Sequence, residues 1–304
     1  MSIARAADIL RAGGLVVFPT ETVYGVGADA TNPRAVARIF AAKGRPQFNP
    51  LISHVLGNAD AERHAILHPK ARALAEAFWP GPLTIVAPRR AESPVAELAC
   101  AGLSTIALRS PSHPMARELL EAFGGPVVAP SANRSGHVSA TTAAHAAADL
   151  GEAVDLILDG GAAGVGIEST IVAIDAEGRA TLLRPGAIGR AAIEAITGPL
   201  ASPATSAIAA PGMMESHYAP RARIVLDAVT PPPGAAYLAF GAEAHEGGLT
   251  LSATGDLTEA AANLYAHLRT LDAMGADTIA VAPIPGDGLA EAIRDRLARA
   301  AAPR

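Results

Sequence analysis

Residues 15–25 read LVVFPTETVYG, an apolar run that passes directly into a polar loop. The run Leu15–Phe18 has the length and composition of a buried strand, and Pro19 stiffens the loop behind it. Before the strand, apolar residues recur at helical spacing over Ile3–Ala12, and Gly13-Gly14 ends that helix. A helix, a strand and a polar strand end in this order are typical of an open α/β sheet, which binds ligands where its strands end.

The same alternation continues to about residue 184. It ends in a predicted hairpin whose turn is Asp175–Gly178. We expect strands at Leu51–Val55, Leu83–Ala87, Thr105–Arg109, Pro126–Ala129, Ala153–Leu158, Ser169–Ile174 and Ala180–Arg184, and helices at 32–42, Pro69–Phe78, Ser112–Phe123 and Thr141–Leu150. Short strands joined both by helices and by a hairpin predict an α/β domain with a twisted mixed sheet.

A break in this pattern divides the chain. Residues 191–221 are rich in proline, serine and glycine and show no clear period, which is typical of a linker. Beyond the linker we expect strands at Ala222–Leu226, Ala236–Phe240 and Thr278–Pro283, and helices at Thr258–Met274 and Asp287–Ala301. The sequence therefore predicts an α/β domain over residues 1–190, a linker over 191–221 and a small second α/β domain over 222–304.

The composition favours a globular protein of the cytoplasm. The 304 residues contain no apolar run of the roughly 18 residues that a membrane-spanning helix needs, and the first residues lack the pattern of a signal peptide. The one cysteine, Cys100, has no partner for an internal disulfide, as is usual in a reducing compartment. A net charge of -5 argues against binding nucleic acid over the whole surface, and we expect no membrane contact.

Polar side chains gather where the predicted strands end. Thr20 and Thr22 follow the first strand, where their hydroxyls suit a small polar ligand, although they would also suit a turn that bonds its own backbone. Lys43 and Arg45 flank a glycine at a helix end, where they suit either a polyphosphate or the helix dipole. His54 alternates with apolar neighbours on a strand, as buried structural histidines also do.

Three later segments repeat this arrangement. Arg109 ends a strand expected to be buried, so it needs an anionic partner from the protein or from a ligand. Residues 129–136, APSANRSG, are small and polar enough for a ligand to approach the backbone closely, and Ser139 lies just beyond; ordinary turn chemistry is the alternative. The hairpin brings residues 168–170, EST, beside residues 184–186, RPG, and a structural pair would explain these as well.

Several classes of site are excluded by their motifs. The sequence has no Gly-x-x-x-x-Gly-Lys-[Ser/Thr], no dinucleotide-binding glycine motif, no Cys-x-x-Cys, no His-Glu-x-x-His and no nucleophile elbow. We therefore expect no P-loop, no resident metal site and no covalent intermediate.

Taken in order, PTETVYG, KGRP with NPL and a histidine, SANRSG, ESTIV and RPG resemble the signature of the threonylcarbamoyl-AMP synthase family, whose catalytic part is a YrdC-like domain. These segments span nearly all of residues 3–190. Residues 210–213, APGM, and 216–220, SHYAP, resemble the linker of the long form of that family, which folds over the pocket as a lid. The resemblance implies a YrdC-like domain over 1–190, a lid within 191–221 and a Rossmann-like domain over 222–304.

The resemblance also implies roles for individual residues. L-threonine would be bound by Thr22, His54, Arg109, Ala129 and Ser169. ATP would be bound by Arg45, Asn49, Thr105, Ser131, Ser139, Arg184 and Tyr218. Lys43 and Arg45 would act in catalysis close to the phosphates.

The implied reaction is an ATP-dependent nucleotidyl transfer. L-threonine and bicarbonate or CO2 would give a carbamate that attacks the α-phosphorus of ATP and expels diphosphate, with Mg²⁺ carried by the ATP phosphates. A separate tRNA threonylcarbamoyl transferase would take the product, and a weak contact with tRNA is a further expectation. Two alternatives are a YrdC-like module that binds RNA without catalysis and a carbamoyl-adenylate enzyme of the hydrogenase-maturation type. The latter carries acylphosphatase and zinc-finger segments that this chain lacks.

Overall fold

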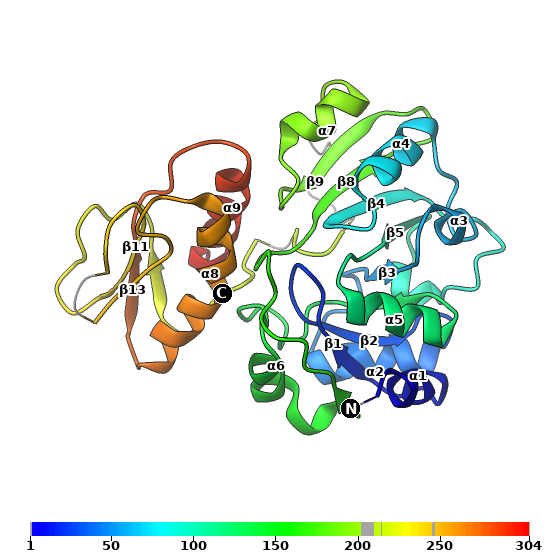
Figure 1. Cartoon of the computed structure of the whole chain (residues 1–304), viewed down its shortest axis with the longest axis horizontal. Coiled ribbons are helices and arrows are strands. Elements are labelled where there is room, and N and C mark those ends of the chain that lie inside the picture. Colours follow the sequence, from blue (N-terminus) through cyan, green and yellow to red (C-terminus); the bar gives the residue numbers. More distant parts are fainter. Residues whose placement is uncertain (1, 202–209, 214, 245–246, 304) are drawn as a thin grey trace.

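The structure, a computed structural model, describes residues 2–201, 210–213, 215–244 and 247–303. Its strands form two separate sheets, and Figure 1 shows the two parts of the chain side by side. The helices are α1 (Ile3–Arg11), α2 (Pro33–Lys43), α3 (Asn58–Ala61), α4 (Pro69–Phe78), α5 (Pro114–Phe123), α6 (Ala143–Leu150), α7 (Arg190–Thr197), α8 (Leu257–Ala273) and α9 (Leu289–Ala301), with the short 3-10 helices η1 (Glu97–Cys100) and η2 (Gly151–Ala153). The strands are β1 (Val16–Phe18), β2 (Gly25–Asp29), β3 (Ile52–His54), β4 (Leu83–Pro88), β5 (Thr105–Arg109), β6 (Val127–Val128), β7 (Leu156–Ile157), β8 (Thr170–Ile174), β9 (Ala180–Arg184), β10 (Arg223–Val225), β11 (Ala236–Ala239), β12 (Leu249–Thr250) and β13 (Thr278–Val281).

The first nine strands build one mixed sheet, which we call the nine-stranded domain with the helices that cover it. The strand order is β7-β1-β2-β6-β3-β5-β4-β8-β9. Parallel pairs β1/β7, β3/β5 and β4/β8 alternate with antiparallel pairs such as β4/β5 and β8/β9, so the predicted mixed sheet is confirmed. In the β3/β5 pair His54 lies opposite Arg109, which places two predicted ligand contacts at the same sheet edge.

Local sequence signals set the ends of the elements. Asn32 caps α2, its side chain accepting from the amides of Arg34 at 3.0 Å and Ala35 at 3.2 Å, and Gly44 ends the helix in the left-handed conformation. The strands between are apolar and fully buried, as at Val17 and Ile85, which is what a sheet covered on both faces requires.

The last four strands form a second, fully parallel sheet in the order β10-β13-β11-β12. Helices α8 and α9 pack on it through a hydrophobic core that also takes in Val23, Val138 and Ile167 of the first part of the chain, and we call this second part the four-stranded domain. In Figure 1 these two helices lie on the side of the sheet that faces the nine-stranded domain. Of the helices in the described residues, none combines the length and the apolar character needed to cross a membrane.

The structure contains elements that the sequence did not predict, among them β2, α3, α7 and β12. Strand β2 (Gly25–Asp29) was not predicted, because it contains two glycines, which are uncommon in strands, although the strand is almost wholly buried. The predicted linker begins with helix α7, whose buried Ile193 joins the core of the nine-stranded domain. Residues 202–209 and 214 of that linker lie outside the described residues, and the exact division at 190 and 222 stays a prediction.

The two domains meet through apolar packing of Val23, Val138 and Ile167, through polar contacts and through a very close backbone approach. Arg269 of α8 forms an ion pair with Asp149, with 2.6 Å between Nη2 and Oδ2. Gly166 has a φ of +78° and lies directly against α8, where a Cβ would stand 2.4 Å from the carbonyl oxygen of Ala261 and from the Cα of Ala262. Only a residue without a side chain fits here.

Candidate active site

A cavity lies where strand ends of the nine-stranded domain meet the linker. Its wall comes from loops after β1, α2 and β6, from strands β3, β5 and β9, from the residues before β8, and from four linker residues. The lining residues are Thr22, Val23, Arg45, Ile52, His54, Arg109, Ala129, Pro130, Ser131, Glu168, Ser169, Arg184, Pro211, Gly212, His217 and Tyr218. All five residues predicted for L-threonine are among them, as are Arg45, Ser131, Arg184 and Tyr218 of the ATP set.

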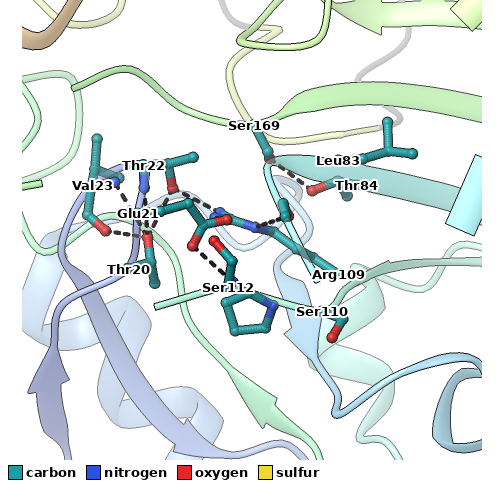
Figure 2. Close-up of polar contacts among 12 residues, drawn as sticks. Thr20, Glu21, Thr22, Val23, Leu83, Thr84, Arg109, Ser110, Ser112 and Ser169 are labelled. Carbon is teal, nitrogen blue, oxygen red and sulfur yellow. Dashed lines mark hydrogen bonds and ion pairs between the residues drawn. The ribbon is translucent and has the colours of Figure 1, made fainter. Parts of the chain in front are cut away.

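One end of the cavity is organised around Arg109, which is 4% exposed. Figure 2 shows its guanidinium between Thr22 and Glu21, donating from Nη1 to Thr22 Oγ1 at 2.8 Å and from Nη2 to Glu21 Oε1 at 2.6 Å. Its Nε donates to the carbonyl of Gly81 at 3.3 Å. A guanidinium has five N–H donors, so two remain after these three bonds. The anion that the strand end requires is therefore supplied by the protein, and a bound anion would share Arg109 with Glu21.

Glu21 was not singled out from the sequence, although it lies within the PTETVYG motif. Its second carboxylate oxygen accepts from the amide of Ser112 at 3.1 Å. Burial alone would raise the pKa of Glu21, but the charge and hydrogen bond of Arg109 outweigh burial and hold that pKa below its usual value. Glu21 is thus ionised at neutral pH and fixes the orientation of Arg109.

Arg184 and Ser169 form the neighbouring part of the wall. Arg184 donates from Nε and Nη2 to the carbonyl of Ser169 at 3.1 and 2.9 Å, and from Nη1 to the carbonyl of Pro211 in the linker at 3.2 Å. The hydroxyl of Ser169 shares a 2.7 Å hydrogen bond with Thr84 (Figure 2). Arg184 therefore connects β9, the start of β8 and the linker.

Arg45 supplies a second buried guanidinium. It donates to the carbonyls of Asn49 at 3.2 Å and Pro50 at 2.9 Å. Burial lowers its pKa to about 10, which still leaves it charged at neutral pH. Within the described part of the chain, no carboxylate forms an ion pair with Arg45 or Arg184. Two positive charges thus face the cavity without an ion-pair partner among the described residues.

The cavity also contains buried polar atoms that have no partner among the described residues. These are His54 Nδ1, His217 Nδ1 and Tyr218 Oη. Burial, and then the neighbouring positive charges, lower the pKa of both histidines to about 3, so both imidazoles are neutral at physiological pH. Because such atoms are costly to bury unpaired, their clustering in one cavity is typical of a site that binds a polar ligand.

Gly212 shows how tightly the linker closes on this cavity. Its φ is +81°, and a Cβ there would lie 2.5 Å from Tyr218 Oη and 3.0 Å from Arg184 Cδ. The linker segment thus rests directly on a cation of the cavity wall, in the position predicted for a lid.

Glu168 is the acidic residue of the cavity wall, and its role was not predicted. Its carboxylate accepts from Ser139 Oγ at 2.5 Å, from Tyr265 Oη at 2.8 Å and from Arg296 Nε at 2.8 Å. Burial would raise its pKa, but the charges of Arg296 and then Arg184, with these hydrogen bonds, lower the pKa to about 2. Two of the three donors come from the four-stranded domain, and no local sequence motif could have indicated them.

Four predicted site residues do not line the cavity. The ammonium of Lys43 is buried and donates to the carbonyls of Ser131, at 2.6 Å, and Asn133, so it supports the loop that carries Ser131. Asn49 is fully buried and its carbonyl positions Arg45. Thr105 begins the strand that Arg109 ends, roughly 13 Å away at the usual rise per residue.

The fourth is Ser139, whose hydroxyl is bonded to Glu168 instead of facing the cavity. Among the described residues there is also no group of histidine, cysteine or carboxylate side chains that could hold a metal ion.

Comparison with known proteins was made against family models, curated sequences and solved structures. Residues 8–186 match the Sua5_yciO_yrdC family model, described as telomere recombination, and residues 188–302 match the model of the threonylcarbamoyl-AMP synthase C-terminal domain. The chain is 38% identical to a threonylcarbamoyl-AMP synthase of Bacillus subtilis, over 99% of this chain and 93% of that protein. It is also 38% identical to one of Pyrococcus abyssi, over 97% of this chain and 92% of that protein.

Solved structures of Sua5 resemble this chain over nearly its whole length. The crystal structure of P. abyssi Sua5 complexed with L-threonine superposes with a TM-score of 0.91 at 36% identity, covering 98% of this chain and 94% of that one. A variant of P. abyssi Sua5 with a histidine and a tyrosine changed to alanine gives a TM-score of 0.89 at 34% identity, covering 98% of this chain and 92% of that one.

Proposed function

The chain belongs to the threonylcarbamoyl-AMP synthase family and is an enzyme of that activity, and we propose that the cavity described above is where it joins L-threonine, bicarbonate or CO2, and ATP into threonylcarbamoyl-AMP and diphosphate. The observation that carries this assignment is the pair of buried guanidiniums, Arg45 and Arg184, that line the cavity and form no ion pair among the described residues, while the carboxylate of the wall, Glu168, is paired with Arg296. A polyphosphate supplies the missing negative charge, and arginine is well suited to bind it because its planar donors match phosphate oxygens.

L-threonine is proposed to bind at the Arg109 end. The two N–H donors of Arg109 that remain after its bonds to Thr22, Glu21 and Gly81 would bind the carboxylate of the amino acid. The unpartnered Nδ1 of His54 would bind one of the substrate's other polar groups. Placing the carboxylate at Arg109 directs the amine toward Arg45 and Arg184, where ATP would lie.

The chemistry then consists of two steps. The neutral amine of threonine attacks the carbon of CO2, which is in equilibrium with bicarbonate, and releases one proton to solvent, which gives a carbamate. A carbamate oxygen attacks the α-phosphorus of ATP, a new P–O bond forms, and the bond to the leaving diphosphate breaks. Mg²⁺, carried in on the phosphates as part of the substrate, would neutralise charge on the diphosphate. The protein contributes alignment and positive charge, which are the main requirements of phosphoryl and nucleotidyl transfer.

Exclusion of water is the proposed contribution of the linker. Both the carbamate and the mixed anhydride decompose readily in water, and the linker residues Gly212, His217 and Tyr218 close one side of the cavity. The product would pass to a separate transferase that modifies adenosine in tRNA, which places the reaction in the compartment of tRNA maturation, the cytoplasm.

The assay incubates the full chain with ATP, bicarbonate and L-threonine and measures diphosphate. We expect diphosphate only when threonine is present, and a strong reduction when bicarbonate is removed. Arg184→Met should abolish most of the activity, whereas Arg5→Met, on the exposed face of α1, should not change it. Absence of threonine-dependent diphosphate release would refute the proposal and favour a module that only binds RNA.

A further inference from the structure

Arg296 is the largest side chain in the described part of the molecule that is almost fully buried, with 1% of its surface exposed, and it belongs to the four-stranded domain. It does not line the cavity. Its guanidinium instead donates from Nε to Glu168 Oε2 at 2.8 Å and from Nη2 to the carbonyl of Pro185 at 2.9 Å, both in the nine-stranded domain. A third donor, Nη1, bonds its neighbour Asp295 at 2.5 Å.

The two residues that Arg296 binds stand next to cavity residues. Glu168 precedes Ser169 at the start of β8, and Pro185 follows Arg184 at the end of β9. Arg184 itself donates to the carbonyl of Ser169. One guanidinium of the second domain therefore joins the two strand ends that present a proposed threonine contact and a proposed ATP contact.

The same side chain also contacts the linker. Its guanidinium carbon lies 5.2 Å from the ring centroid of Tyr218, and Tyr265 stacks against that ring, with 5.7 Å between the ring centroids. Tyr218 is thus in contact with both Arg296 and Tyr265. Tyr265 also donates to Glu168 at 2.8 Å, so both residues of the four-stranded domain hold the same carboxylate and the same lid residue.

The charge of Glu168 makes this arrangement important for an anionic ligand. Glu168 lines the cavity that Arg45 and Arg184 make positive, and an unneutralised carboxylate there would repel a polyphosphate. The titratable and charged groups around it are Arg296 and Tyr265 on α9 and α8, Arg184 on β9, Lys43 on α2, and His217 and Tyr218 in the linker. Of these, only Arg296 forms an ion pair with Glu168 among the described residues.

We propose that Arg296, assisted by Tyr265, is a positioning residue for ATP: it fixes the strand ends that carry Ser169 and Arg184 and neutralises Glu168, so that the four-stranded domain prepares the cavity without contacting substrate. This inference rests on the proposed function. It gives the second domain a definite task in the reaction.

The test measures the dissociation constant of ATP by calorimetry for the full chain at pH 6 and pH 8, and compares Arg296→Met with the wild type at each pH. Loss of the cation raises the pKa of the buried Glu168, so the carboxyl of the variant is more often neutral at the lower pH. The dissociation constant of ATP should therefore be at least about tenfold higher for the variant than for the wild type at pH 8. This ratio of dissociation constants should be smaller at pH 6. For the double variant Glu168→Gln/Arg296→Met, the ratio of its ATP dissociation constant to that of the wild type should be the same at both pH values.

Three further variants complete the design. Arg294→Met is the matched control on the same helix, because in the part of the chain that the structure describes its guanidinium donates to the carbonyls of Ile284 and Gly286, both in the four-stranded domain. The ATP affinity of this variant should equal that of the wild type. Arg296→Lys keeps the charge and should restore most of the affinity at pH 8. Tyr265→Phe removes a single hydroxyl and should weaken ATP binding by a smaller factor than Arg296→Met does. This variant keeps the test usable if Arg296→Met does not fold.

Two results would overturn the inference: an Arg296→Met protein that binds ATP as well as the wild type, or a loss that is equal at both pH values and unchanged by Glu168→Gln. Either outcome would make Arg296 a purely structural residue. Failure of the proposed function has a different signature, because wild-type protein would then release no threonine-dependent diphosphate whatever the variants do.

Discussion

Replacing Arg109 by methionine separates the role of this residue in threonine binding from its role in stability. In the structure the side chain is 4% exposed and its 2.6 Å ion pair with Glu21 is buried. Methionine preserves the volume but leaves the Glu21 carboxylate without its cation. Removal of one partner of a buried pair costs about 3–5 kcal/mol of folding free energy. At about 2–4 °C per kcal/mol for a domain of this size, the melting temperature should fall by roughly 6–20 °C.

The effect on ligands should be selective. A charge-assisted hydrogen bond contributes about 1.5–3 kcal/mol, so threonine should bind roughly 10- to 150-fold more weakly. ATP, proposed to lie at Arg45 and Arg184, should change by no more than about twofold, as expected for sites that share no contact. Titration calorimetry with each ligand alone measures the two affinities, and scanning calorimetry measures the melting temperature.

The control is the double variant Glu21→Gln/Arg109→Met. It removes the unpaired carboxylate together with the cation, so most of the lost stability should return while threonine binding stays weak. Equal losses of threonine and ATP affinity in Arg109→Met, or recovery of threonine affinity in the double variant, would show that Arg109 supports the fold and does not bind the substrate.

Three more predictions test other parts of the cavity. Gly212→Ala should reduce diphosphate release strongly, because the added methyl group displaces Tyr218 from the cavity, and should also lower the melting temperature, because Tyr218 belongs to a buried cluster with Tyr265; an active variant would mean that the linker does not close there. Lys43→Met should lower the melting temperature of the ligand-free protein, because it removes the donor that holds two loop carbonyls; unchanged stability with weakened ATP binding would instead restore the predicted contact with phosphate. Between pH 6.5 and about 3 the free energy of unfolding should fall, because the unfolded chain protonates His54 and His217 while the folded chain keeps them neutral. Urea titrations at pH 7, 5.5 and 4.5 measure this fall, and it should be shallower once both are replaced by glutamine.

Much of the fold could be predicted because its signals are local. Apolar runs of strand length, the Asn32 cap of α2 and the hairpin turn before β9 each identify an element from a few neighbouring residues. The order of the strands could not be predicted, since β6 lies between β2 and β3 although it follows them by dozens of residues in the chain. Helix α7 was missed because the prolines that follow it dominated the interpretation of that stretch.

The residues of the candidate site could also be predicted only in part. Thr22, Arg109 and Ser169 could be placed because Thr22 follows, Arg109 ends and Ser169 begins a predicted strand. Thr105 does not line the cavity because it stands at the opposite end of the strand that Arg109 ends, and its contact with ATP stays a prediction. The loop contacts of Lys43 could not be predicted, because its position on α2 does not reveal that its ammonium turns inward onto a distant part of the chain, and its role near the phosphates stays a prediction.

The acidic residues were missed for a related reason. Glu21 and Glu168 are bonded to arginines that lie 88 and 128 residues away in sequence. Such pairs can be identified only in the folded chain. From the sequence alone, an acidic residue beside a hydroxyl-rich motif cannot be distinguished from an acidic residue exposed to solvent.

The bare backbone of Gly166 against α8 has a mechanical consequence. With no side chain between them, the main chains of the two domains are in direct contact, and that contact sets their spacing. A single methyl group at residue 166 would act as a spacer that pushes α8 outward and withdraws Tyr265, which lies on the same helix, from Glu168. The smallest change that can uncouple the two domains is therefore one carbon atom, placed at a position that contributes nothing to the cavity itself.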